Sequence, residues 1–206
     1  MSRIKIVIIS LGILILIGAG IIIYVERPAT NKSNSTQPAT AQSQFALPVV
    51  NYKTGQTKKH FGQYITPQNS PVQPERFTGY HTGVDIEQVQ DNTDVPVYAI
   101  ADGTVRYINY VSGYGGVIVI QFDYNGQAYT ALYGHIRLAS ATAKVDGKVT
   151  KGEKLAVLGA PYSSETNGER KHLHFSIHKG SSIELRGYVQ NQSELSSWID
   201  PNTIIN

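Results

Sequence analysis

The hydrophobic and polar positions divide the chain into three parts. Residues 6–25 form an apolar run of 20 residues without a charge. A helix of that length spans about 30 Å, the hydrocarbon thickness of a bilayer. The polar stretch at 28–44 has no periodic apolar positions and cannot bury enough surface to fold. The pattern predicts a membrane anchor at 1–27, a flexible tether at 28–47 and a folded domain at 48–206.

The apolar run is predicted to be an uncleaved signal anchor. Hydrophobic regions of signal peptides are about 7–15 residues long, and no clear small-residue cleavage motif follows this run, so a cleaved signal peptide is the alternative. Two basic residues flank each side, Arg3 and Lys5 before and Arg27 and Lys32 after. The positive charge of the α-amino group favours an N-terminus on the cytoplasmic side of the membrane. We therefore expect a single-pass protein of the cell membrane with its domain on the extracytoplasmic side.

The domain is predicted to be mainly β. Residues 104–110 alternate between apolar and polar positions, as expected of a half-buried strand. Asn125 and Gly126 form a two-residue hairpin signal between the strand-like segments 117–122 and 128–133. A short helical turn is expected only near 193–198. The pattern indicates an antiparallel sheet folded on itself, without the alternating helices of a parallel α/β fold.

Charge and cysteine content narrow the functional classes. The net charge of +3 comes from residues 1–47, which hold four basic residues and one acidic residue, whereas residues 48–206 hold 14 of each. No cluster of Lys and Arg interleaved with aromatic residues remains in the domain, so no nucleic-acid partner is expected. The chain has no cysteine, which excludes disulfides and cysteine-based metal sites.

Histidines give the domain its candidate chemistry. In a strand, His172 and His174 lie on one face and could direct two imidazoles at one metal, although an ordinary amphipathic strand has the same pattern. His81 and Asp85 are four residues apart with a glycine between them, and neutral imidazole and ionised carboxylate both suit zinc. Spacing leaves open whether His172 or His174 binds the metal, and His135 alone could be a simple turn residue.

Three motifs occur in order along the domain: HTGVD at 81–85, YGHI at 133–136 and HLHF at 172–175. With them the chain resembles the lysostaphin/LytM-type zinc endopeptidases, which cut peptide cross-links in bacterial peptidoglycan. The resemblance covers roughly residues 81–201. It implies a folded antiparallel two-layer β-sheet with a long groove over one zinc ion, and peptidoglycan stem or bridge peptides as partners.

The resemblance also implies roles for individual residues. His81, Asp85 and His174 match the zinc ligands of the family, and His135 and His172 match its two catalytic histidines that do not bind metal. The chain has no helical HExxH motif, so histidine, with an ordinary pKa of about 6.5, is the remaining candidate for a base. We expect His135 and His172 to share the base and the oxyanion-stabilising roles.

Two segments depart from the family pattern, and three other functions fit parts of the sequence. Residues 160–171 are longer and more charged than the usual turn, residues 61–80 are rich in Pro and Gln, and both are predicted to rim the groove. Tyr80 and Tyr133 are candidate substrate contacts, although Tyr133 equally fits a packed core. The alternatives are an inactive regulator of other wall hydrolases, a biotinyl- or lipoyl-type carrier, and a zinc peptidase with another peptide substrate. The sequence predicts no oligomeric state.

Overall fold

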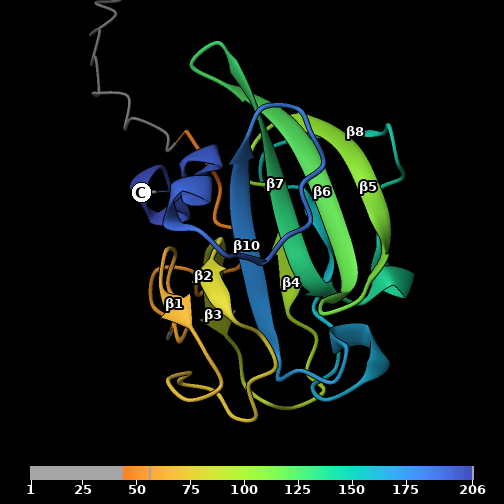
Figure 1. Cartoon of the computed structure of the whole chain (residues 1–206). Helices are drawn as coiled ribbons and strands as arrows, with labels where there is room; N and C mark the ends of the chain where they lie inside the picture. The colour runs from red at the N-terminus through yellow and green to blue at the C-terminus, as the bar shows by residue number, and fades with distance from the viewer. Residues whose placement is uncertain (1–43, 56, 206) are drawn as a thin grey trace, which may run out of the picture. The chain divides into compact units, whose positions relative to one another are not determined.

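The computed structural model describes residues 44–55 and 57–205 (Figure 1). The predicted anchor at 1–27 and most of the predicted tether lie outside these residues. Within the described part of the chain, no helix is long and apolar enough to cross a membrane.

The largest sheet has seven strands, and each of its pairings is antiparallel (Figure 1). Its order is β12-β10-β7-β6-β5-β8, and β3 also pairs with β10. Its strands are β3 (Gly83–Glu87), β5 (Gly103–Val111), β6 (Gly115–Tyr124), β7 (Gln127–Ile136), β8 (Lys148–Val149), β10 (His172–Lys179) and β12 (Trp198–Ile199). Strand β10 therefore lies between β7 on one edge and β3 and β12 on the other.

Two smaller antiparallel sheets complete the β-structure of the described residues. One has the order β1-β2-β11, and the other pairs β4 with β9. These strands are β1 (Tyr64–Ile65), β2 (Gly79–His81), β4 (Pro96–Tyr98), β9 (Lys154–Val157) and β11 (Tyr188–Val189). The helical segments in this part are short 3-10 turns at Leu138–Ser140, Ser164–Thr166, Gln192–Ser197 and Pro201–Thr203. The described domain is mainly β and antiparallel, as predicted.

The hairpin predicted at Asn125 and Gly126 joins β6 to β7. Both residues have positive φ, 50° and 75°, which is the conformation that a tight two-residue hairpin turn requires. Tyr124 pairs with Gln127 on either side of the turn. This turn fixes the register of the two longest strands and therefore the position of the end of β7.

The core lies between one face of the large sheet and the β4–β9 pair. It contains alternate residues of β6, β7 and β10 together with residues of β4 and β9: Ile118, Ile120, Ala131, Tyr133, Leu173, Phe175, Ile177, Val97, Leu155 and Ala156. A smaller apolar cluster of Tyr114, Val117, Val119 and Leu132 lies on the other face. Because side chains alternate along a strand, His172 and His174 lie on the face opposite Leu173 and Phe175.

Candidate metal centre

Strand pairing brings the three predicted zinc ligands together. Asp85 on β3 pairs directly with His174 on β10, so their side chains emerge side by side on the same face. His81, the last residue of β2, places its Nε2 3.0 Å from His174 Nδ1. Asp85 Oδ1 lies 3.0 Å from His174 Nδ1 and 3.2 Å from His81 Nε2. Three potential ligand atoms thus form a small triangle.

The size and chemistry of this triangle suit zinc. Tetrahedral zinc with bonds of about 2.0–2.2 Å separates its ligands by about 3.3–3.5 Å, slightly more than the separations here. Two imidazole nitrogens and one carboxylate oxygen are common zinc donors, and all three residues are buried. A set of three protein ligands leaves one position for water or substrate, as in catalytic zinc sites.

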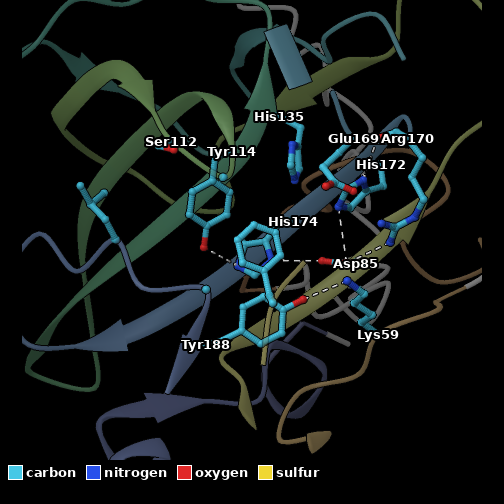
Figure 2. Close-up of a pocket in the computed structure, with 14 residues that line it drawn as sticks. Lys59, Asp85, Ser112, Tyr114, His135, Glu169, Arg170, His172, His174 and Tyr188 are labelled. Atoms are coloured by element: carbon cyan, nitrogen blue, oxygen red, sulfur yellow. Dashed lines mark hydrogen bonds and ion pairs between the residues drawn. The ribbon is translucent and has the colours of Figure 1, made fainter. Parts of the chain in front are cut away.

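Neighbouring groups fix the orientation of the two histidine ligands. The Nδ1 of His81 lies 3.3 Å from the carbonyl oxygen of His60, to which a protonated Nδ1 donates a hydrogen bond. The Nε2 of His174 lies 3.2 Å from the hydroxyl oxygen of Tyr114 (Figure 2). With hydrogen on these outer nitrogens, the inner nitrogens keep their lone pairs for a metal, as expected of histidine ligands.

The charge states around Asp85 also suit a metal site. Burial raises the pKa of Asp85, but His172, His81 and His174 more than offset it and hold the pKa well below its usual range. Burial lowers the pKa of His174, so this imidazole stays neutral at neutral pH. Metal ligands must be deprotonated, and both residues are in that form.

His135 and His172 form a pair beside these ligands, with ring centroids 4.1 Å apart. The Nδ1 of His172 donates to the carbonyl oxygen of Arg170 at 2.9 Å, while its Nε2 lies 3.4 Å from Asp85 Oδ2. Burial lowers the pKa of His135 to about 3 and also lowers that of His172. Both histidines are neutral at neutral pH, and their pKa values differ from the ordinary value assumed from sequence.

A local irregularity aims His135 at the site. The β6–β7 register passes from Val117 opposite Gly134 to Gly116 opposite Ile136, which leaves His135 as the extra residue of a bulge. His135 has φ of 62°, in the left-handed region that few non-glycine residues adopt. Bulges commonly redirect a side chain beside an active site.

The site opens into a cavity of about 110 Å³. Asp85, His135, His172 and His174 line it together with Lys59, Phe77, Tyr114, Glu169, Arg170 and Tyr188 (Figure 2). Both segments predicted to rim the groove contribute to the wall, Phe77 from 61–80, and Glu169 and Arg170 from 160–171. The structure thus brings all five predicted site residues to one place.

Sequence reasoning missed several residues of this wall. Tyr114 lies in a glycine-rich turn without periodicity. Arg170 continues the two-residue spacing of His172 and His174, a signal that could have identified it. Lys59 is buried, and its Nζ donates to the Tyr188 hydroxyl at 3.0 Å.

The two candidate substrate tyrosines have other surroundings. Tyr80 lies outside the residues that line the cavity, and its ring contacts Tyr64 with centroids 4.8 Å apart. Tyr133 is fully buried in the core, where its hydroxyl oxygen accepts a hydrogen bond from the backbone N–H of Ile100 at 3.0 Å. The packing interpretation of Tyr133 is therefore confirmed.

A buried His–Asp–His ligand set on a mainly β domain, next to two neutral histidines in a cavity, defines the class of zinc metallopeptidases. Comparison with known proteins gives the particular family. Residues 79–185 match peptidase family M23, and the chain belongs to that family.

Individual relatives agree with this assignment. An "uncharacterized metalloprotease" of Haemophilus influenzae is 34% identical over 116 residues, which are 53% of this chain and 22% of the relative. The chain thus spans about a fifth of the length of that curated relative. The match to LytU has a TM-score of 0.50 at 26% identity and covers 72% of this chain and 83% of LytU.

Two more distant structures share the fold. The catalytic domain of lysostaphin, an antimicrobial peptidase from Staphylococcus simulans, matches with a TM-score of 0.50 at 22% identity, over 73% of this chain and 92% of that domain. A chain of the SpoIIQ–SpoIIIAH pore-forming complex matches with a TM-score of 0.53 at 17% identity, over 80% of this chain and 92% of that chain. Since this fold also occurs in a pore-forming complex, function must be argued from the site.

Proposed function

We propose that this protein is a membrane-anchored zinc metalloendopeptidase that hydrolyses peptide cross-links in bacterial peptidoglycan. The observation that carries the proposal is the convergence of His81, Asp85 and His174 on one point beside the His135–His172 pair. Membership of family M23 and the likeness to the lysostaphin catalytic domain support it. All five residues that the resemblance assigns to catalysis or metal binding are present, which favours an active enzyme over an inactive regulator.

In this proposal His81, Asp85 and His174 hold the metal. When bound, zinc supplies Lewis acidity, which activates water and polarises a carbonyl oxygen. Asp85 stays ionised and His174 stays neutral, and the inner nitrogens of the two histidines, Nε2 of His81 and Nδ1 of His174, face Asp85 Oδ1 in the ligand triangle.

His135 and His172 share the proton transfers. Each is neutral and can accept the proton of the attacking water, or donate a hydrogen bond to the developing oxyanion once protonated. His172 is fixed in one tautomer by the carbonyl of Arg170, so its Nε2 is the free nitrogen. Asp85 lies close enough to that nitrogen to stabilise an imidazolium. When the C–N bond breaks, the protonated histidine returns its proton to the leaving amine.

The apolar run at 6–25 supports the anchoring part of the proposal. We place the domain outside the cytoplasmic membrane, where a tether at 28–47 lets it reach the wall. Alkaline carbonate washing should leave the full chain with the membrane pellet and release a variant that lacks residues 1–27. Protease added to intact spheroplasts should digest the domain, and a protected domain would contradict the orientation.

Digestion of defined peptidoglycans tests the substrate. We would incubate the zinc-loaded full chain in detergent with two walls, one cross-linked through glycine bridges and one cross-linked directly, and analyse fragments by mass spectrometry. The expected result is new amino termini at one type of cross-link. His174→Ala should release nothing, whereas His178→Ala, altered on the same strand outside the site, should behave as wild type. Failure to cleave either wall would contradict the proposed peptidoglycan substrate. If other peptides were cleaved instead, the protein would still be a zinc peptidase, but with a different substrate.

A further inference from the structure

Arg170 connects the charged segment 160–171 to the metal centre. The residue is only 5% exposed, and its guanidinium lies between two carboxylates. One is that of Asp85, whose ion pair with Arg170 is drawn in Figure 2, and the other is that of Glu87. These two acidic residues are two positions apart on β3, so they lie on the same face of the strand. Without a cation between them, two carboxylates in this buried setting would repel each other.

The contacts of Arg170 are those of a planar fork. Its Nε donates to both oxygens of Glu87 at 2.9 Å, and its Nη2 donates to Glu87 Oε1 at 2.6 Å. The same Nη2 donates to Asp85 Oδ2 at 3.0 Å. Arginine forms such multiple contacts because its donors are rigidly arranged, whereas lysine offers a single point charge. Glu87 therefore holds the guanidinium, and the guanidinium holds Asp85.

The two oxygens of Asp85 consequently face different partners. Oδ2 faces Arg170 at 3.0 Å and His172 Nε2 at 3.4 Å. Oδ1 faces His174 Nδ1 at 3.0 Å and His81 Nε2 at 3.2 Å, which places it in the ligand triangle. Rotation of the carboxylate to present both oxygens to a metal would break the contact with Arg170.

We propose that Arg170 is a positioning residue that presents a single oxygen of Asp85 to the metal and so keeps a coordination position open for water. The inference rests on the proposed zinc site. It gives the unusual segment 160–171 a role at the metal centre besides forming a wall of the cavity. Groups that orient metal ligands typically change metal affinity by about 10–100-fold when they are removed.

Four variants of the full chain separate this role from a purely structural one. Arg170→Gln removes the charge and the fork, and Arg170→Lys keeps the charge alone. The double variant Arg170→Gln/Glu87→Gln preserves the charge balance of the buried cluster but still leaves Asp85 without its donor. The matched control is Arg76→Gln, because Arg76 is half-exposed and contacts Glu169 rather than Asp85.

Two measurements apply to each variant, after thermal melting in chelator has shown which variants fold. Zinc affinity is measured by competition with a chelating dye, and coordination number by the visible spectrum of the Co²⁺-substituted protein. Four-coordinate Co²⁺ absorbs more strongly than five-coordinate Co²⁺. We expect Arg170→Gln and the double variant to bind zinc about 10–100-fold more weakly and to lose Co²⁺ absorption. Arg170→Lys should retain only part of the zinc affinity and of the Co²⁺ absorption of wild type, and Arg76→Gln should match wild type in both measurements.

Wild-type zinc affinity or an unchanged Co²⁺ spectrum in a folded Arg170→Gln or double variant would overturn the inference. This result differs from the one expected if the proposed zinc site itself is wrong. If the zinc site is wrong, wild type binds no zinc, and His174→Ala does not change the zinc affinity. If wild type binds zinc, His174→Ala loses it and Arg170→Gln keeps it unchanged, the zinc site stands and the role of Arg170 is wrong.

Discussion

Tyr114 shows how a single side chain outside the ligand set can prepare a ligand. Its hydroxyl lies 3.2 Å from His174 Nε2. Strand β7 lets the Tyr114 ring come this close because residue 134 is glycine. A Cβ at Gly134 would lie 2.6 Å from Tyr114 Cδ1 and 3.3 Å from the Cβ of His174. The glycine of the YGHI motif therefore has a physical reason, since it lets the tyrosine reach the ligand.

Tyr114→Phe should weaken zinc binding by about 10–100-fold, because it removes the hydrogen-bond partner that orients His174. Isothermal titration of the metal-free chain with zinc measures the change. Tyr110→Phe is the matched control, since it removes a 2.6 Å hydrogen bond to Asn167 on an exposed tyrosine away from the ligands. Equal zinc affinity in Tyr114→Phe and wild type would show that the hydroxyl does not orient the ligand.

Replacement of either proposed catalytic histidine, His135 or His172, should separate metal binding from activity. His135→Ala and His172→Ala are expected to keep zinc and to lose about 10²–10⁴-fold in kcat, the usual contribution of general acid–base catalysis. Zinc content and peptide hydrolysis are measured on the same preparations. A His172→Ala variant with wild-type kcat would remove that residue from the proposed mechanism.

At the scale of elements, local pattern predicted strands better than their pairing. The alternation of residues 172–177 correctly placed Leu173 and Phe175 on one face and the two histidines on the other. The pairing of His174 with Asp85, 89 positions away, has no local signal. Strand β3 is buried along most of its length and lacks the alternation of a half-exposed strand.

The choice between neighbouring histidines was also beyond local reasoning. His172 and His174 share one face, so spacing could not distinguish ligand from base, and only the family resemblance did. In the structure the two histidines differ in strand register: His174 lies opposite Asp85 and within the group that could hold a metal, whereas His172 lies opposite Glu87. Arg170 continues the two-residue spacing of His172 and His174, but only the pairing of β10 with β3 shows that its partners are Asp85 and Glu87.

Contact between β10 and β12 should make stability depend on pH. His178 is half-buried against Trp198, with ring centroids 4.9 Å apart, and burial lowers its pKa below 6.5. The unfolded chain therefore gains a proton at higher pH than the folded chain. The contribution of His178 is fully present above about pH 6.5 and is lost as pH falls from there through the folded pKa.

Thermal melting at pH 8 and pH 5 tests this dependence. His178→Gln should lose less Tm between these two values than wild type, because glutamine does not titrate. The comparison is made on metal-free protein, so that changes in zinc binding do not contribute. An equal loss of Tm in both proteins would exclude His178 as a source of the pH dependence.

At the scale of the whole molecule, charge and chemistry are separated along the chain. The net positive charge lies in residues 1–47, and the domain at 48–206 has equal numbers of acidic and basic residues. The functional residues instead form one buried cluster in which acidic, basic and neutral groups depend on each other. Sequence composition excludes cysteine chemistry and gives no reason to expect a nucleic-acid partner, whereas the contacts within the cluster form only when β2, β3, β7 and β10 are placed together.

Metal content is the most direct test of the proposed zinc site. The full chain, purified in detergent without chelators and dialysed against trace zinc, is analysed for metal by mass spectrometry and for protein by amino-acid analysis. One zinc per chain is expected in wild type and in His172→Ala, and none in Asp85→Ala or His174→Ala. A folded wild-type chain that takes up no zinc, or a His174→Ala variant that holds zinc as wild type does, would contradict the proposed zinc site.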